Sequence, residues 1–417
     1  MTSPQTPRWS DRAQSGKLCY EEEEILKVVG KVVAERIAPR AERYDASSEF
    51  PWDNIRDLNV LELNKILIPE EYGGIGASYR CFLRIVQALS SGCASTGIIW
   101  ATTFHAIMPI IDFGTDEQKK AVLPRIAAGG LAAIAITEEG AGSDASNMRT
   151  SFAPHGDKIR VNGTKAFITS GDVADLCLVF GNWGEGTTRP RGLSAVIVER
   201  DNPGYTVIAT EKKLGHRASS TVRLAFDDCL IPQENLLGRP GDGFMILLAA
   251  LNRSRPSTAA QALGIARAAF DEAVGYVNER VQFGGPLLDL EGVQFKIADM
   301  AVALALAESW LWHVGTLIDE GNKNFAVEAS IAKLTASDAA MKIALDALQL
   351  HGGYGYCVGA RVERLFRDAK VTQIWEGANE VHRQFIGRSF RNRGESGAGR
   401  HYGEDAAAFV GGEGGAR

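Results

Sequence analysis

Residues 158–168 read Lys-Ile-Arg-Val-Asn-Gly-Thr-Lys-Ala-Phe-Ile, and this stretch decides the fold. Its centre is Asn162-Gly163, which separates two short runs, 158–161 and 164–168. An Asn-Gly pair favours a tight hairpin turn, because both turn positions need a positive φ. The stretch therefore predicts a β-hairpin that turns at Asn162-Gly163, and it places strands in the middle of the chain.

The sequence on either side of this hairpin has the same strand-like character. Between residues 131 and 238 the chain is rich in Gly, Thr and Ser, and it contains the apolar run Ala195-Val196-Ile197-Val198. Val222, Leu224 and Phe226 alternate with other residues, as in a strand with one buried face. We expect this segment to form a middle β-domain, barrel-like or sandwich-like.

Further out, the periodicity is helical in both directions. Ile25, Val28 and Val32 recur at helical spacing near the N-terminus. After Asp242, long Ala-rich helical patterns return and are interrupted by glycines such as Gly321. Helices, then strands, then longer helices predict an α+β fold rather than a doubly wound nucleotide-binding fold.

The predicted boundaries follow these changes of periodicity. They are a flexible N-terminus at 1–20, an N-terminal α-helical domain at 21–130, a middle β-domain at 131–238, a C-terminal helical bundle domain at 239–391, and a disordered Gly-rich tail at 392–417.

Composition excludes several classes of protein. The chain has 417 residues, 45% of them hydrophobic, and a net charge of only -6. Lys and Arg are scattered, so we expect no nucleic-acid partner. The longest uninterrupted apolar stretches, such as Phe244–Leu251, are too short for a bilayer. The polar first twenty residues resemble no secretory signal, and the six cysteines form no C-x-x-C pair. We expect a cytoplasmic protein with reduced thiols and no membrane association.

Common catalytic motifs are also absent from the sequence. There is no G-x-G-x-x-G, no G-x-x-x-x-G-K-[ST] and no G-x-S-x-G. The seven histidines form no H-E-x-x-H helix, so we expect no metal site, and we interpret His105 and His351 as structural.

Two polar segments remain as candidates for a ligand site. The first is the small-residue loop Thr137–Asp144, which follows the apolar run 132–136 and allows a ligand close to the backbone. The second is Phe167 and Thr169, two residues apart and so on one face of a strand. Such a pair suits a planar ring that is stacked and bonded at its edge. The alternative is an ordinary strand with Phe167 in the core.

Glu376, between Trp375 and Gly377, is the candidate catalytic base. The alternative is a glutamate at the end of a helix.

Taken together, the motifs resemble the acyl-CoA dehydrogenase family in order and spacing over about residues 20 to 390. They are Thr137-Glu138-x-Gly140-Ala141-Gly142-Ser143-Asp144, Asn162-Gly163-x-Lys165-x-Phe167-Ile168-Thr169, Arg280-x-x-Phe283-Gly284, Leu350-His351-Gly352-Gly353-Tyr354-Gly355, Arg367-Asp368-Ala369 and Glu376-Gly377.

This resemblance implies FAD as the cofactor, a C-terminal four-helix bundle, and α,β-dehydrogenation of an acyl-CoA with Glu376 as the base. An aqueous carboxylate is a weak base for an α-hydrogen, and exclusion of water strengthens it. The implied substrate contacts are Ser143, Asn252, Arg255 and Gly377, although an interhelical salt bridge is an alternative role for Arg255. The implied cofactor contacts are Thr137, Gly142, Ser143, Phe167, Ile168, Thr169, Arg280, Gln282, Phe283, Gln349, Gly352, Gly353, Asn379 and Glu380.

The resemblance also implies partners. Arg280, Phe283, Gln349 and Gly353 match a surface that reaches the FAD of a neighbouring subunit, so we expect a homodimer or homotetramer. An electron-transfer flavoprotein is the expected acceptor of electrons.

Several positions depart from the family's commoner residues, among them Glu291, Asn252, Ala378 and Glu139. They leave the thiol carrier open between coenzyme A and acyl carrier protein. Trp100 could shorten the acyl pocket or be an ordinary core residue. An acyl-CoA oxidase that passes electrons to O₂, a flavin monooxygenase and a non-catalytic flavin-binding protein are the alternative functions. Glu376 argues against the monooxygenase, which needs no carboxylate base.

Overall fold

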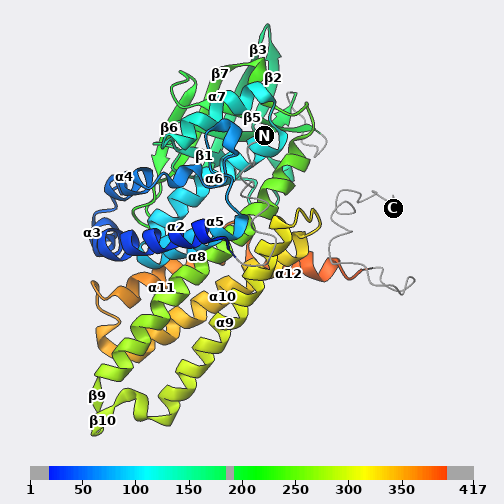
Figure 1. Ribbon diagram of the computed structural model, residues 1–417. Coiled ribbons are helices and arrows are strands. Elements are labelled where there is room, and N and C mark those ends of the chain that lie inside the picture. Colours follow the sequence, from blue (N-terminus) through cyan, green and yellow to red (C-terminus); the bar gives the residue numbers. More distant parts are fainter. Residues whose placement is uncertain (1–17, 185–191, 392–417) are drawn as a thin grey trace, which may run out of the picture.

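The computed structural model describes residues 18–184 and 192–391. The predicted flexible N-terminus lies almost wholly outside the described residues, and the predicted Gly-rich tail lies wholly outside them. Figure 1 shows the strands of the middle segment gathered at one end of the molecule, while the longest helices extend towards the opposite end.

Two of the N-terminal helices begin at a side-chain cap. The Ser78 hydroxyl accepts a hydrogen bond from the Cys81 N–H at the start of α5, and Thr115 with Gln118 forms a capping box at α7. The helices of this domain are α2 (Tyr20–Val32), a π-helical turn (Val33–Ile37), α3 (Ala38–Ser47), α4 (Trp52–Val60), α5 (Tyr79–Gly92), α6 (Ala94–Phe113) and α7 (Asp116–Ala127).

Two helices of the described chain are long and apolar enough to cross a membrane by length and composition alone. In α6, 94% of the most apolar window is buried inside the protein, so α6 is a core helix. In α9 (Glu291–Asp319) only 28% of the corresponding window is buried. A helix apolar on most sides is normally covered, and α9 therefore presents an apolar face that the described residues leave uncovered.

The middle segment forms one mixed sheet of eight strands in the order β6-β7-β3-β2-β4-β5-β8, with β1 paired to β4 in parallel. The strands are β1 (Ala132–Ala135), β2 (Ser151–His155), β3 (Lys158–Thr169), β4 (Leu176–Trp183), β5 (Leu193–Glu199), β6 (Tyr205–Thr210), β7 (Thr221–Pro232) and β8 (Leu236–Leu237).

The predicted hairpin turn at Asn162-Gly163 is wrong. Strand β3 runs straight through both residues, and the tight turn lies earlier, at Gly156-Asp157 between β2 and β3. Gly163 has a φ of 146° and lies at a shift of register against β7. A Cβ at Gly163 would approach the Thr150 hydroxyl to 2.6 Å. The glycine therefore permits a bulge in the strand and a close approach of two backbones. Both are reasons, other than a turn, for a glycine within a strand.

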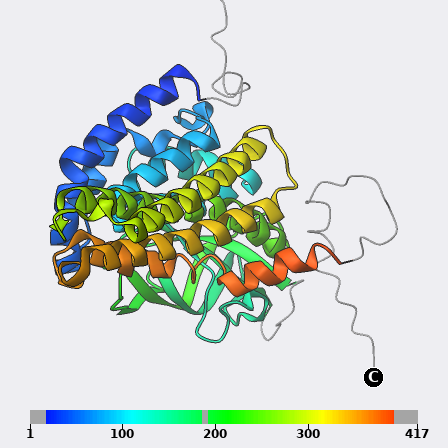
Figure 2. The same ribbon diagram turned by 90° about the horizontal axis from the view of Figure 1, so that it is seen from below.

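The C-terminal helices pack around α8 (Gly243–Glu279), which contacts α5 and α6 as well as the other bundle helices. After α8 come the short hairpin β9 (Val281–Gln282) and β10 (Gly285–Pro286), then α9, α10 (Ala326–His351), α11 (Arg361–Val371) and α12 (Asn379–Arg388). Figure 2 shows the bundle helices running side by side, with α12 extending beyond them.

One side chain of α11 ties the three parts of the chain together. The Arg367 guanidinium makes ion pairs with Asp45 of α3 at 2.6 Å and with Glu363 at 2.7 Å. It also donates a hydrogen bond to the Leu214 carbonyl at 3.0 Å. Its side chain is only 12% exposed. Since Leu214 belongs to the middle segment, α11 is fixed against both of the other domains.

Candidate active site

Glu376 lies in the turn that joins α11 to α12. Helix α11 ends at Val371 and α12 begins at Asn379, so Glu376 is not a helix-terminal residue. Its φ is 52°, and that of Gly377 is 93°. A positive φ is uncommon for a residue with a side chain and costs on the order of 1–3 kcal/mol. The surrounding structure must therefore hold this turn in place.

The Glu376 carboxylate faces hydroxyl and imidazole groups. The Ser254 hydroxyl of α8 donates a hydrogen bond to it at 2.5 Å. His105 Nδ1 of α6 lies 4.0 Å from the other carboxylate oxygen, and the Glu376 side chain is 20% exposed. The other nitrogen of His105 is 2.9 Å from the Ser257 hydroxyl. Burial lowers the pKa of His105, against an opposing effect of Glu376, so its neutral form is favoured.

A buried arginine lies on the α8 side of the carboxylate. The Arg255 guanidinium donates hydrogen bonds to the Asn252 side chain at 2.9 Å and to the Ser330 hydroxyl at 3.4 Å. Burial lowers the pKa of Arg255 to about 10, and the charge of Glu376 partly offsets this effect. Arg255 therefore carries a positive charge next to the candidate base at neutral pH.

The backbone of the turn is held from two further helices. Lys333 Nζ of α10 donates hydrogen bonds to the Gly377 carbonyl at 2.6 Å and to the Asn379 side chain at 2.8 Å. His382 Nε2 of α12 lies 3.1 Å from the Glu376 carbonyl. Burial lowers the pKa of His382 to about 3, so its ring is neutral at physiological pH and donates through Nε2.

Phe167 does not lie in the core, so that alternative is wrong. It has a φ of 59° and is 59% exposed, at a shift of register between Lys165 and Ile168. Thr169 is half-buried, whereas Ile168 is 2% exposed and packs into the core. An exposed ring on a rigid bulge suits stacking against a planar ligand, and Ile168 would contribute its backbone only.

The polar loop that begins at Thr137 is joined to this bulge. The Ala166 N–H donates to the Thr137 carbonyl at 2.9 Å. Gly142 and Ser143 are exposed, and a Cβ at Gly142 would meet no atom within 4 Å. The loop thus offers open backbone beside an exposed aromatic ring, which fits the isoalloxazine of a flavin.

A buried ion pair anchors the base of the loop. Lys165 Nζ contacts a Glu138 carboxylate oxygen at 2.8 Å and donates to the Ile136 carbonyl at 2.9 Å. The Glu138 carboxylate also accepts from the backbone N–H groups of Arg149 and Thr150. Burial lowers the pKa of Lys165 to about 8, against the charge of Glu138. Burial acts to raise the pKa of Glu138, but Lys165 and the hydrogen bonds outweigh it, and that pKa falls.

Contacts between domains connect both the turn of Glu376 and the flavin loop, Thr137–Asp144, to the middle segment and to helix α6. The ring of Trp375 packs edge-on against His216, a residue of the middle segment, with 5.0 Å between centroids. Thr103, on the helix that carries His105, accepts a hydrogen bond from the Ala132 N–H at the start of β1. Thr137 lies two residues after the end of β1. One chain therefore assembles the Glu376 side and the Phe167 side of the candidate site.

A second set of predicted cofactor residues lies far from this site. Arg280 follows the last residue of α8, 25 positions after Arg255, which corresponds to roughly 37 Å along a helix. Phe283 is 92% exposed, and the Arg280 guanidinium lies 5.9 Å from the Tyr354 ring centroid. Figure 1 shows β9 and β10 at the end of the molecule opposite the sheet. The exposed residues of this distal set are Arg280, Gln282, Phe283, Gln349, Gly352 and Gly353.

Of the two predicted cofactor residues on α12, only Glu380 is exposed. The Asn379 side chain is 3% exposed, and its amide donates to Ser337 at 2.9 Å and to Asp338 at 2.7 Å. Any contact of Asn379 with a cofactor would therefore involve its backbone.

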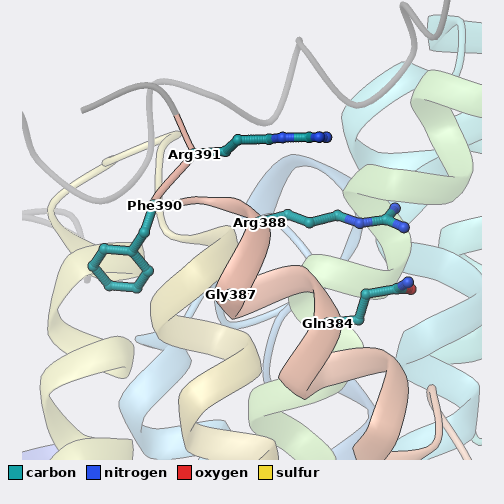
Figure 3. A pocket seen from close by; sticks show the side chains of 5 residues that line it. All are labelled: Gln384, Gly387, Arg388, Phe390 and Arg391. Carbon is teal, nitrogen blue, oxygen red and sulfur yellow. The ribbon is translucent and has the colours of Figure 1, made fainter. Parts of the chain in front are cut away.

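Further along α12 there is a pocket of about 470 Å³ (Figure 3). It lies at the C-terminal end of the helix, beyond the residues that hold Glu376. Its lining residues are Gln384, Gly387, Arg388, Phe390 and Arg391.

The structure bears on both histidines interpreted as structural, and it decides one open alternative. The His351 ring stacks on Tyr276 with 4.2 Å between centroids, which fits a structural role. His105 is buried and bonded to Ser257 but also lies 4.0 Å from the candidate base, so its structural role stays a prediction. Trp100 is 1% exposed, packs against Phe82 and Phe104, and donates to Asn64, so it is a core residue.

Sequence reasoning missed Ser254, Lys333 and His382 as neighbours of Glu376. Lys333 stands 43 positions before Glu376, and no local pattern links the two. A lysine on the apolar, Ala-rich pattern of α10 was the one available signal, because lysine is seldom buried without a partner.

Comparison with known proteins gives three family models that together cover most of the chain. They are described as the N-terminal, middle and C-terminal domains of acyl-CoA dehydrogenase, and they match residues 20–130, 133–229 and 241–390. An acyl-CoA dehydrogenase of Bacillus subtilis is 44% identical over 366 residues, which are 87% of this chain and 96% of that protein.

Two solved structures have the same fold. Butyryl-CoA dehydrogenase from Megasphaera elsdenii superposes with a TM-score of 0.86 at 37% identity, covering 89% of this chain and 98% of that one. A chain from the structure describing the electron transferring flavoprotein of Acidaminococcus fermentans superposes with a TM-score of 0.88 at 38% identity, covering 90% and 99%.

Proposed function

The chain belongs to the acyl-CoA dehydrogenase family of FAD-dependent oxidoreductases, and on that premise we propose that it oxidises an acyl-CoA to the trans-2-enoyl-CoA. Glu376 is the base that removes the α-hydrogen. The observation that carries this proposal is the left-handed turn at Glu376-Gly377, which is held from several helices and presents a carboxylate between Ser254 and His105.

Glu376 takes the α-proton on its carboxylate, and the charge that develops on the thioester oxygen needs hydrogen-bond donors. The Glu376 backbone N–H is one such donor, and the turn fixes its direction. Arg255, together with Asn252, supplies positive charge and polar contacts on the α8 side of the substrate. Gly377 and Ser143 flank the thioester. The bound flavin supplies the acceptor for the β-hydrogen, which leaves as a hydride.

The flavin is held from two chains in this proposal. Thr137, Gly142, Ser143, Phe167, Thr169 and the backbone of Ile168 line one side of it. Asn379, through its backbone, and Glu380 contribute from α12. Arg280 is roughly 37 Å along α8 from Arg255, too far to reach the same flavin, and the rest of the distal set lies at or just after the C-terminal ends of α8 and α10. This set therefore serves the flavin of a second subunit in a homodimer or homotetramer. The uncovered apolar face of α9 supports such an assembly.

We propose that the protein acts in the cytoplasm and that its electron acceptor is an electron-transfer flavoprotein. The likeness to a chain in a structure describing an electron transferring flavoprotein supports this assignment. The oxidase alternative is distinguished by one measurement, because an oxidase forms peroxide with substrate and air alone. Negligible peroxide without an added acceptor is the expected result.

The test of the base is Glu376→Gln. The amide cannot accept the α-proton at neutral pH, so we expect a folded, yellow oligomer whose flavin is not bleached by acyl-CoA under anaerobic conditions. A loss of about 100- to 10,000-fold in rate is expected from removing the general base. Anaerobic flavin bleaching of the wild-type protein with a panel of acyl-CoA and acyl carrier protein thioesters identifies the carrier. Bleaching of the variant at the wild-type rate would contradict the assignment.

A further inference from the structure

Lys333 is the most deeply buried charged group around the candidate base. Its exposure is 0%, and it lies on α10. Taking an ammonium group out of water costs several kcal/mol even after the protein relaxes. A lysine at such a position needs a compensating role, since an apolar residue of the same length would fill the space without this cost.

The hydrogen bonds of Lys333 are directed at the segment that follows the base. Nζ reaches the Gly377 carbonyl at 2.6 Å and the Asn379 side chain at 2.8 Å. Asn379 is itself fixed, because its amide donates to Asp338 at 2.7 Å. Asp338 in turn accepts from Gln373 at 2.7 Å and from Arg383 at 2.6 Å. The network therefore holds residues before Glu376 in the sequence as well as residues after it.

The turn itself needs such support. Glu376 and Gly377 both have left-handed backbone conformations, and the former is a strained one for a glutamate. His382 contacts the Glu376 carbonyl, and a Cβ on Gly377 would approach the His382 ring to 3.0 Å. The Ser254 hydroxyl bonds the Glu376 carboxylate rather than the backbone of the turn. Lys333 instead donates to the carbonyl of Gly377, the residue immediately after the base. It therefore fixes the turn one peptide beyond the Glu376 carbonyl that His382 contacts.

We propose that Lys333 is a positioning residue for the base, fixing the turn at Glu376-Gly377 so that the carboxylate and its backbone N–H keep the geometry needed for α-proton removal. This inference rests on the proposed function. Lys333 reaches the reacting atoms only through the turn, and it takes no proton from substrate. Burial lowers its pKa to about 7, with Glu376 and Asp338 opposing this effect and Arg255 adding to it.

The test compares Lys333→Met with the wild-type holoenzyme in single-turnover, anaerobic flavin reduction by a saturating range of acyl-CoA. Methionine keeps the apolar stem and removes the ammonium group. The limiting rate is expected to fall about 10- to 100-fold, as misplacement of a reacting group by about 1 Å produces. The FAD content and the dissociation constant of the substrate are expected to stay within about threefold of wild type, because Lys333 itself contacts neither ligand in this proposal and most of the residues assigned to them lie outside the turn.

A second readout follows the turn directly. Amide hydrogen exchange of the FAD-loaded oligomer is expected to accelerate in peptides covering residues 372–382 and nowhere else. Lys333→Gln, which keeps donors on a shorter neutral chain, should give an intermediate rate and intermediate exchange. If Lys333→Met does not fold, the limiting rate and the exchange of Lys333→Gln test the positioning role in its place. Lys342→Met is the control, since Lys342 lies on the same helix but is 52% exposed and pairs with Asp346.

Unchanged exchange at 372–382 would overturn the inference, as would a wild-type limiting rate in Lys333→Met. A fall in rate that accompanies an equal loss of FAD or of substrate affinity would also overturn it, because that pattern reports general damage. Failure of the proposed function is a separate result. It requires Glu376→Gln to reduce its flavin with substrate, whereas an inactive Glu376→Gln beside a fully active Lys333→Met sinks the positioning role alone.

Discussion

Two buried lysines show how the partner of an ammonium group determines its protonation. Lys165 touches a carboxylate, Glu138, and its pKa is lowered to about 8. Lys333 hydrogen-bonds to a carbonyl and an amide, with Glu376 and Asp338 acting only through space, and its pKa is lowered to about 7. The Glu138 carboxylate in direct contact offsets more of the effect of burial on the pKa of Lys165 than the more distant carboxylates offset for Lys333.

The depressed pKa of Lys333 predicts a specific dependence of stability on pH. Between about 7 and its ordinary value of 10.5, Lys333 is mostly neutral in the folded protein and charged in the unfolded chain. The unfolded state then binds more protons, so the free energy of unfolding rises with pH across this window. From pH 7 to 9 the gain is at most about 2–3 kcal/mol.

Urea denaturation of wild type and Lys333→Met at pH 7 and pH 9 measures this effect, since all other titrating groups are common to both proteins. Wild type should gain more stability than the variant between the two pH values. Equal changes in both proteins would show that Lys333 does not titrate in this range.

At the residue scale, the sequence predicts the motif residues of the site but not the side chains that surround them. Glu376, Thr137 and Phe167 stand out through local composition and through resemblance. Ser254 and Lys333 meet Glu376 from helices that are distant in sequence. Only the packing of α8 and α10 against the turn brings these side chains together, and one sequence contains no record of that packing.

At the scale of elements, α11 is fixed by the largely buried ion pairs of Arg367 with Asp45 and Glu363. Arg367→Met leaves these two carboxylates without their partner. Breaking a buried pair costs about 3–5 kcal/mol, so we expect a clearly lower denaturation midpoint in thermal unfolding of the holoenzyme. The Trp375–His216 contact should loosen as well, because α11 leads into the turn of Glu376.

The matched control is Lys120→Met. Lys120 pairs with Asp116 on the exposed surface of α7, with side chains 68% and 58% exposed. Exposed pairs of this kind contribute about 0–1 kcal/mol. If both variants shifted the midpoint equally, Arg367 would have no special role in joining the domains.

The elements also show where sequence rules succeed and fail. The alternation of helical and strand periodicity predicts the α+β fold correctly, because each element buries one face and shows it in its apolar spacing. The Asn162-Gly163 pair misleads for a physical reason. A glycine with positive φ serves a bulge as well as a turn, and the choice depends on Thr150, which crosses Gly163 closely from another segment.

For the whole molecule, the distance between Arg255 and Arg280 on α8 makes the oligomer part of the site. Arg280→Ala removes a charge from the distal set without touching the residues around Glu376. We expect weaker retention of FAD and a weaker dimer, while the turn of Glu376 stays intact. Gel filtration with absorbance at flavin wavelengths, over a range of protein concentrations, measures both.

Lys212→Met is the control for this variant, since Lys212 is exposed in the middle domain. Retention of FAD by Arg280→Ala equal to that of wild type and of the control would contradict a flavin shared between subunits.

The 37-residue length of α8 has a consequence for inheritance. A copy of this chain damaged at Glu376 still carries a sound Arg280, and a copy damaged at Arg280 still carries a sound Glu376. When both are made in one cell and pair with each other, one of the two sites receives an intact residue from each parent. Under the shared site proposed above, two alleles that are each inactive alone therefore complement each other. Activity then depends on which two copies pair, and not on either copy alone.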